Sequence, residues 1–325
     1  MTPRAIRLDV HAHVIPLRED DVQAVPGVQW MDAGHVRVDG ADLAKRELYQ
    51  PQDLLGWMDT NRVAQAWISI PPTLYRPQLD ATAAREWASC VNAALVRVAA
   101  HAPQRLAPML HLPVAHPAVA AQIVSIHAVD AGCAKFAMCA GDAARGVMLS
   151  HADYEPLWAA LERVRAFLFL HPSRGCDSRF DAFYLQNLLN NPLETALAAA
   201  HLAMSGVLER HPNITFCLAH GGGATAAVAG RLERGQATGR PGADLGGEGV
   251  RRGLRRFCVD CITHDPAALQ LAAAVHGSDR ILFGSDWPFE MGLFEPHTQL
   301  AGVDAELLQG IMVENPPRLL RVLGV

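Results

Sequence analysis

The chain of 325 residues contains eight short apolar runs, most of them followed by a longer stretch rich in Ala and Leu with helical spacing. Such runs of Val, Ile, Leu and Phe are typical of strands in a parallel sheet covered by helices. Eight units of this kind predict a closed (β/α)8 barrel, and the chain can form it as one domain over residues 1–325. The runs are 6–13, 63–70, 106–112, 133–138, 167–171, 214–220, 257–262 and 281–286.

Two segments interrupt this repeat. Residues 20–50 hold the turn pairs Pro26-Gly27 and Asp39-Gly40 around short alternating runs, which predicts a small hairpin insertion after the first strand. This insertion could cover the mouth of the barrel. Residues 238–253 are rich in glycine and predict a mobile loop between the sixth and seventh strands.

Three of the apolar runs carry candidate metal ligands at or near their ends. His11 and His13 are two residues apart on the first predicted strand, so both imidazoles point to the same side and can reach one metal ion. His171 and Asp286 end two other runs. A lone histidine there is usually structural, and a lone aspartate can cap a helix. Because the carboxyl ends of barrel strands meet at one face, these four residues together predict a metal site.

His220 ends the sixth run and is followed by Gly221-Gly222-Gly223. The glycines allow backbone or substrate to approach closely, although a tight turn alone would also explain them. A divalent metal lowers the pKa of its bound water, and an imidazole beside that water can accept the proton. We therefore predict that His220 is a catalytic residue at the metal site.

Composition excludes several other classes of protein. The net charge of −5 comes without a basic stripe, and 6% aromatic residues do not suggest base stacking, so we expect no nucleic-acid partner. No run of about 18 apolar residues suggests a membrane helix, and the first predicted strand leaves no room for a signal peptide, so we expect a cytoplasmic protein without a membrane partner. Seven cysteines do not suggest a disulfide framework. Cys258 and Cys261 are interpreted as buried strand residues, with a metal or redox role as the alternative.

Five motifs together resemble the metal-dependent decarboxylases related to amidohydrolases, the family typified by 2-amino-3-carboxymuconate 6-semialdehyde decarboxylase. They follow the family's order over nearly the whole chain, including the insertion after the first strand. The motifs are Asp-Val-His-Ala-His at 9–13, Leu-His-Pro at 170–172, Ala-His-Gly-Gly-Gly at 219–223, Val-Asp-Cys-Ile-Thr-His-Asp-Pro at 259–266 and Gly-Ser-Asp-Trp-Pro-Phe at 284–289.

The resemblance implies an amidohydrolase-type barrel that binds one divalent metal. The implied ligands are His11, His13, His171 and Asp286, and His220 is implied to activate the metal-bound water. Some members that use manganese have glutamate in place of the first histidine. Because this chain retains His11, the resemblance favours zinc, with manganese as the alternative.

The resemblance also bears on substrate and assembly. Arg231 occupies the place of a carboxylate-binding arginine that enters the neighbouring subunit's site in the semialdehyde decarboxylase, which implies a homodimer. Leu54 replaces the family's second arginine, which argues for a different carboxylic acid. Arg174 could substitute for it, and Trp57 is a candidate pocket aromatic. A surface role for the two arginines and core packing for Trp57 are the alternatives.

The sequence therefore predicts a metal-dependent non-oxidative decarboxylase, a carboxy-lyase, whose substrate is a small aromatic or unsaturated carboxylic acid. A proton delivered through His220 or from Asp286 itself would precede loss of carbon dioxide. The alternatives are a hydrolase of an amide, lactone or ester, a hydratase of an unsaturated acid, and a non-catalytic metal-binding protein. A bridging role for Lys135 in a two-metal hydrolase is disfavoured, because Lys135 lies inside its run.

Overall fold

A computed structural model describes residues 4–130, 134–142, 146–173, 175, 177–243 and 249–324. The central strands pair in parallel in two groups, β1-β5-β6 and β7-β8-β9-β10-β11-β12. Their bounds are β1 (Ile6–His13), β5 (Val63–Ser69), β6 (Leu106–Pro108), β7 (Leu110–Leu112), β8 (Lys135–Cys139), β9 (Phe167–His171), β10 (Thr215–Leu218), β11 (Cys258–Asp260) and β12 (Ile281–Leu282). Cys133, expected at the start of the fourth run, lies outside the described residues.

The two groups of strands join to close a barrel. β6 and β7 belong to one run interrupted at Met109, whose backbone N–H donates to the carbonyl of Ile68 in β5 at 2.8 Å. On the other side, the N–H of Val10 in β1 donates to the carbonyl of Phe283 at 3.0 Å, and Ala12 bridges to Trp287 in parallel. The predicted (β/α)8 fold is therefore confirmed.

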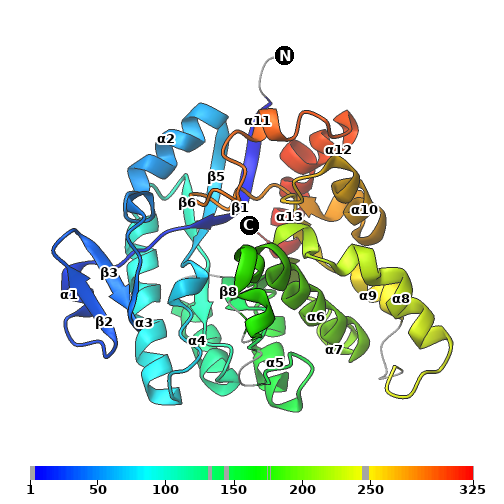
Figure 1. The fold of residues 1–325 in the computed structure, drawn as a ribbon, viewed down its shortest axis with the longest axis horizontal. Helices are drawn as coiled ribbons and strands as arrows, with labels where there is room; N and C mark the ends of the chain where they lie inside the picture. Colours follow the sequence, from blue (N-terminus) through cyan, green and yellow to red (C-terminus); the bar gives the residue numbers. More distant parts are fainter. Residues whose placement is uncertain are drawn as a thin grey trace.

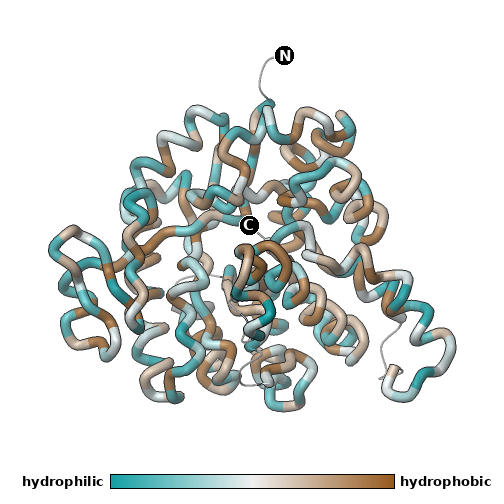
Figure 2. Tube along the Cα trace, in the orientation of Figure 1, coloured by the Kyte–Doolittle hydropathy of each residue, from teal (hydrophilic) through white to brown (hydrophobic). Residues whose placement is uncertain are grey.

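Helices form a ring around the strands (Figure 1), and hydrophobic and hydrophilic residues alternate along them (Figure 2). Asp80 shows how the sequence starts one of them, because its carboxylate accepts the N–H groups of Thr82 and Ala83 at 2.9 Å. None of the described helices is both long enough and apolar enough to cross a membrane. The main helices are α2 (Pro51–Asn61), α3 (Ala81–Ala99), α4 (Pro117–Asp130), α5 (Glu155–Arg163), α6 (Asn191–Met204), α7 (Val207–Arg210), α8 (Thr225–Ala237), α9 (Val250–Leu254), α10 (Pro266–His276), α11 (Pro296–Gln299), α12 (Ala305–Gln309) and α13 (Asn315–Leu323).

The insertion after β1 forms the expected hairpin but lies beside α3 rather than over the barrel mouth (Figure 1). It contains a short helix and an antiparallel sheet in the order β2-β3-β4. The Arg76 guanidinium holds it through two hydrogen bonds of 2.8 and 2.7 Å to the Asp39 carboxylate. The described cavities at the metal centre have no lining residue from this insertion. Its elements are α1 (Glu19–Val22), β2 (Val28–Met31), β3 (His35–Val38) and β4 (Ala41–Asp42).

The mouth is bordered instead by the segment after β9, which runs through η5 (Ser178–Phe180), η6 (Ala182–Tyr184) and the π-helical η7 (Gln186–Asn190). The prediction of a loop at 238–253 is partly wrong, because α9 begins at Val250, within this range. Residues 244–248 of that loop lie outside the described residues.

The buried His111, the middle residue of β7, leads to a prediction about the pH dependence of stability. It is 1% exposed, stacks on Tyr75 with ring centroids 5.4 Å apart, and neither ring nitrogen has a hydrogen-bond partner among the described residues. Burial lowers the pKa of His111 from 6.5 to about 3. The unfolded chain therefore binds a proton below about pH 6.5 that the folded chain excludes, so stability is present above that pH and is lost as the pH falls toward 3.

We expect His111→Phe to keep the stack and remove this loss. The substitution changes the free energy of unfolding by some amount at each pH. This change should be about 2 kcal/mol more favourable at pH 5 than at pH 8. Urea unfolding of both proteins at the two pH values measures the difference. An equal dependence on pH in wild type and variant would contradict the assignment.

Candidate metal centre

The structure brings the four predicted ligands together at the carboxyl ends of the strands. His11 Nε2 and His13 Nε2, both from β1, are 3.1 Å apart, and Asp286 Oδ1, from the loop after β12, is 3.3 Å from each. His171 ends β9, and its ligand atom lies within 4.8 Å of those of His11, Asp286 and His220. All four predicted ligands are buried.

The second nitrogen of each imidazole is held by a neighbouring oxygen. His11 Nδ1 donates to Asp260 Oδ2 at 2.7 Å, and His171 Nδ1 donates to the carbonyl of Pro172 at 2.7 Å. His13 Nδ1 lies 3.1 Å from an oxygen of Ser69 and 3.3 Å from the carbonyl of Ile70. These contacts favour the tautomer with the proton on Nδ1, which leaves the Nε2 lone pair free for a metal.

The free lone pairs fit one divalent ion. His171 Nε2 is buried and has no hydrogen-bond partner in the described part of the chain. The Nε2 atoms of His11 and His13 face each other at 3.1 Å, and two lone pairs at this distance repel unless a proton or a cation lies near them. Tetrahedral ligands bound at about 2.0–2.1 Å to a metal such as zinc are about 3.4 Å apart, close to the separations here.

The electrostatics of the centre lead to the same conclusion. Burial alone would lower the pKa of His11, but the charge of Asp286 and the hydrogen bond to Asp260 raise it to about 10. Burial also lowers the pKa of His13, and burial with the neighbouring histidines lowers that of His171 well below its usual value. Without a metal, a second proton makes His11 a cation between the carboxylates of Asp260 and Asp286. A bound cation would displace that proton, so metal binding releases it.

Asp260, at the end of β11, connects His11 to the turn that carries His220. One carboxylate oxygen accepts from His11 Nδ1 and from the backbone N–H of His220 at 2.9 Å. The other accepts from the N–H groups of Gly221 at 2.8 Å and Ile262 at 3.0 Å. This role of Asp260 was not predicted from the sequence, although a carboxylate at the end of an apolar strand was the available signal.

Asp9 has a similar role between β1 and the loop that carries Asp286. Its carboxylate accepts the N–H of His11 at 3.0 Å and both the N–H and the hydroxyl of Ser285, at 3.0 and 2.5 Å. This role of Asp9 was not predicted from the sequence either. The cysteines near Asp260 are buried and free as expected, namely Cys258 and Cys261.

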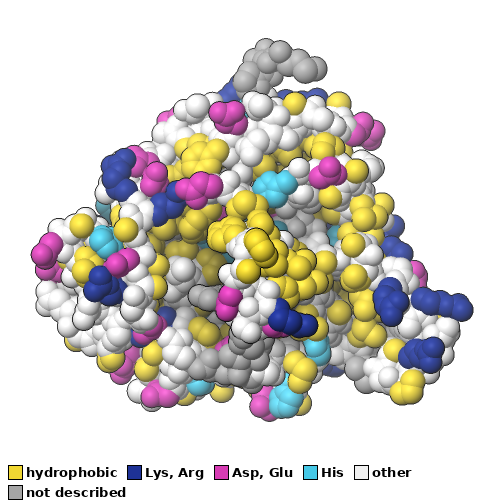
Figure 3. Space-filling view, in the orientation of Figure 1, with side chains coloured by type: hydrophobic (Ala, Val, Ile, Leu, Met, Phe, Trp, Pro, Cys, Tyr) yellow, Lys and Arg dark blue, Asp and Glu magenta, His cyan; other side chains and the backbone are white. Residues whose placement is uncertain are grey.

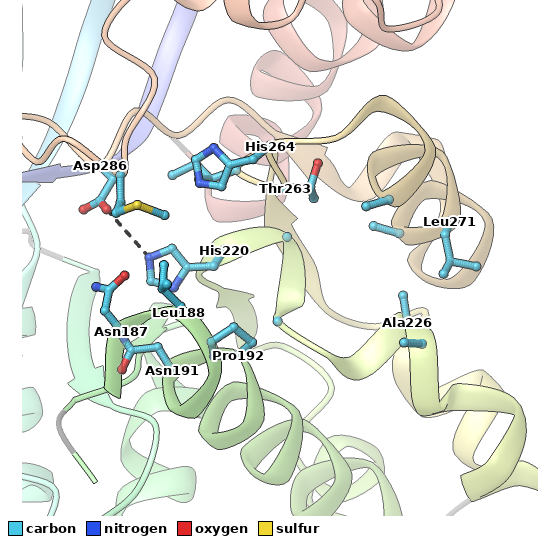
Figure 4. A pocket seen from close by; sticks show the side chains of 17 residues that line it. Asn187, Leu188, Asn191, Pro192, His220, Ala226, Thr263, His264, Leu271 and Asp286 are labelled. Carbon is cyan, nitrogen blue, oxygen red and sulfur yellow. Dashed lines mark ion pairs between the residues drawn. The ribbon is translucent and has the colours of Figure 1, made fainter. Parts of the chain in front are cut away.

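His220 stands on a tight turn, η8 (His220–Gly222), beside the metal ligands. Its φ is 56°, and the glycines that follow also have positive φ, which places the turn in the left-handed region. A Cβ at Gly223 would collide with the carbonyl of Pro192, so glycine is required where the turn meets α6. His220 Nε2 lies 3.8 Å from Asp286 Oδ2 (Figure 4). The imidazole therefore faces the metal ligands while its side chain remains 19% exposed.

Two cavities meet at this centre. The larger, of about 740 Å³, reaches His13, His171 and the segment after β9, and the smaller, of about 290 Å³, lies between α8 and α10. The described residues that line them include neither Lys nor Arg. Both cavities are lined by Asn187, Asn191, His220, Asp286 and Met291.

Of the three predicted substrate-binding residues, neither Arg231 nor Trp57 lines the described cavities at this centre. Arg231 is exposed on α8, and Arg174 lies outside the described residues. Trp57 lies on α2, where its indole N–H donates to the carbonyl of Phe294 at 2.8 Å, and it is not among the described residues that line the cavities. Lys135 starts β8, at the end of the strand away from the metal centre, with its ammonium 5.6 Å from the centre of the Trp67 ring.

A closed barrel with a His-x-His pair on its first strand and an aspartate after its last strand defines an amidohydrolase-type metal centre. The family model described as Amidohydrolase matches residues 8–322, and the chain belongs to this family. The 2-amino-3-carboxymuconate-6-semialdehyde decarboxylase of Dictyostelium discoideum is 25% identical over 307 residues, covering 90% of this chain and 84% of that relative.

Solved structures share the fold over almost its whole length. A 2,6-dihydroxybenzoate decarboxylase from Rhizobium superposes with a TM-score of 0.80 at 22% identity, over 98% of this chain and 99% of that chain. A dihydroxybenzoic acid decarboxylase from Polaromonas, with bound manganese, superposes with a TM-score of 0.80 at 20% identity, over 98% of each chain.

Proposed function

We propose that this protein is a metal-dependent non-oxidative decarboxylase that acts on a small aromatic or unsaturated carboxylic acid. The observation that carries the proposal is the convergence of His11, His13, His171 and Asp286 on one point, with His220 in the same cluster at the meeting point of two cavities. A two-metal hydrolase is disfavoured because Lys135 starts its strand and cannot bridge ions at the other end. The decarboxylases among the relatives support the same reaction.

The chemistry requires one proton to replace one carboxylate. The proton joins the carbon that carries the carboxylate, and the electrons of the breaking carbon–carbon bond return to the π system as carbon dioxide leaves. When bound, a divalent metal supplies positive charge that polarises a substrate oxygen and stabilises the negative charge that develops. His220 and Asp286 both line the two cavities, so these side chains can hold and move the proton next to a substrate.

We propose zinc as the metal. Three imidazole nitrogens and one carboxylate form a ligand set that suits zinc, whereas manganese more often takes oxygen ligands. The manganese bound in the Polaromonas neighbour makes manganese the alternative.

We also propose a cytoplasmic location. Free buried cysteines, such as Cys258 and Cys261, suit a reducing compartment.

The decisive experiment combines metal content with carbon dioxide release. We expect one ion per chain and release of carbon dioxide from at least one acid in a panel that includes 2,6-dihydroxybenzoate, 6-methyl-2-hydroxybenzoate and muconate-type acids. A chelator should abolish release, and zinc or manganese should restore it to different extents. Two ions per chain, with hydrolysis of lactones or esters and no carbon dioxide from any acid, would establish the hydrolase instead.

We also propose that the protein works as a homodimer in which Arg231 binds the carboxylate in the partner's site. Hydrophobic side chains gather on the face that Figure 3 shows. The exposed hydrophobic side chains of the chain include Phe183 at 87% and Tyr184 at 63%, in η6, and Leu188 at 48%, in η7. A monomer rarely exposes a large contiguous apolar patch. The exposed Arg231 is a cation that a neighbouring subunit's site could use, since the described lining of the cavities contains none. Arg174 remains a second candidate.

Complementation between two weak variants tests this arrangement. Arg231→Ala keeps its own His220, and His220→Ala keeps the Arg231 that it would donate to its partner. After subunit exchange, half of the dimers are mixed and each has one complete site, so the mixture should recover about a quarter of wild-type activity. If both variants and wild type sediment as monomers, or if mixing restores nothing, the shared site is wrong.

A further inference from the structure

The smaller cavity extends away from the metal ligands and is mainly apolar. We call it the side chamber, and it lies between α8 and α10 next to His220 (Figure 4). Ala226 of α8 and Leu271 of α10 lie on opposite sides of it (Figure 4). Leu188, Pro192 and Ile262 contribute further apolar surface. Of the four predicted metal ligands, only Asp286 is among the described residues that line the side chamber.

Two neutral amides stand where the side chamber joins the larger cavity. Asn187 of η7 and Asn191 at the start of α6 line both cavities, and Figure 4 shows both beside His220. Neither carboxamide has a hydrogen-bond partner among the described residues. Beyond this boundary the described chamber wall contains neither Lys nor Arg, and its polar side chains are the half-buried Thr263 and the exposed His264. A second carboxylate placed there would lose its hydration without gaining a permanent counter-charge.

We propose that the side chamber binds an apolar substituent of the substrate while the substrate's carboxylate lies at the metal centre. This inference rests on the proposed function and narrows it to a monocarboxylic acid that carries an alkyl group or a second apolar ring. Continuity with the site supports this occupant, because the chamber opens directly onto His220 and Asp286. Its volume of about 290 Å³ is also sufficient, since a cavity of about 150 Å³ holds benzene in another protein.

If the side chamber binds an apolar substituent, a methyl group on the acid should increase the affinity of the protein for that acid. Burying one methyl group strengthens binding about fourfold. We would measure the binding of 2-hydroxybenzoate and its four ring-methylated derivatives to the zinc-loaded protein by calorimetry. At least one derivative should bind about fourfold more tightly than the parent acid. Equal or weaker binding of all four would overturn the proposal.

Filling the chamber should remove this preference. Ala226→Leu adds bulk from α8 into the chamber, so the preferred derivative should bind no better than 2-hydroxybenzoate. Ala237→Leu makes the same change at the exposed end of α8 and should retain the preference. If Ala226→Leu does not fold, Leu271→Ala removes apolar surface from the opposite wall and should reduce the preference.

A neutral probe separates failure of the chamber from failure of the proposed function. Saturation-transfer NMR should detect toluene bound to wild type and Ala237→Leu, but not to Ala226→Leu. If the acids show the Ala226-dependent preference but no acid in the panel releases carbon dioxide, the chamber stands and the decarboxylase is wrong. If Ala226→Leu leaves acid preference unchanged and instead alters the sedimenting mass, a second copy of the chain occupies the chamber and the inference fails.

Discussion

His220→Asn is expected to lower kcat by about 10²–10⁴-fold while one metal ion per chain is retained. Asparagine cannot accept and release a proton, and among residues with a Cβ it tolerates the left-handed backbone that His220 adopts, at φ 56°. The change therefore removes proton transfer without forcing the glycine turn to rearrange. We expect the metal to stay bound, because four other candidate ligands, His11, His13, His171 and Asp286, converge without His220.

Metal analysis and turnover must be measured on the same sample, because His220 also lies within 4.8 Å of two of the imidazole ligands and Asp286. If the variant loses both metal and activity, His220 is a ligand rather than a proton carrier. Turnover close to wild type with metal retained would remove its catalytic role altogether. His101→Asn, at an exposed position after α3, controls for the chemical change and should leave turnover unchanged.

The convergence of the four candidate ligands could be predicted because it depends on local rules that the fold preserves. Alternation along a strand places His11 and His13 on one side, and a parallel barrel collects strand ends at one face, which brings in His171 and Asp286. The ladder of β1 with β5 and its contacts with the loop after β12 then fix these positions. Neither rule needs knowledge of the loops.

The cavity walls could not be predicted in the same way. Residues 178–190 form short 3₁₀ turns and a π-helix, which have no regular hydrophobic period, so Asn187 could not be predicted as a cavity residue. The place of the insertion depends on the pairing of Arg76 with Asp39, which are 37 residues apart, and a local pattern does not contain this contact. Trp57 follows the insertion in sequence, but its helix packs outside the site.

Asp260 shows a second reason why the role of a residue could not be predicted from the sequence. Its identity as a buried carboxylate was visible, but its role depends on four N–H groups that come from three segments of the chain. Burial alone would raise the pKa of Asp260, yet the hydrogen bond and the charge of His11 lower it, so the group is held as an anion. The carboxylate has only acceptor sites, and each of its oxygens receives two of the four donors.

Asp260→Asn is expected to weaken zinc binding by about 10–100-fold and to lower turnover as well. An amide replaces one acceptor oxygen by an NH₂ donor. If that donor faces His11 Nδ1, the imidazole must move its proton to Nε2, which removes the lone pair from the metal centre. If the amide takes the opposite orientation, the donor faces the N–H groups of Gly221 and Ile262 and the turn that carries His220 is disturbed.

Competition with a chelator measures the zinc affinity, and turnover at saturating zinc separates the two effects. Saturating zinc should restore part of kcat when the main loss is metal affinity, whereas a purely structural defect would appear as lower thermal stability at every zinc concentration. Asp265→Asn is the matched control. Asp265 caps α10 by accepting the N–H groups of Ala267 and Ala268, and asparagine caps a helix equally well, so zinc affinity should stay unchanged. Wild-type zinc affinity in Asp260→Asn would show that His11 does not need a carboxylate to present Nε2 to the metal.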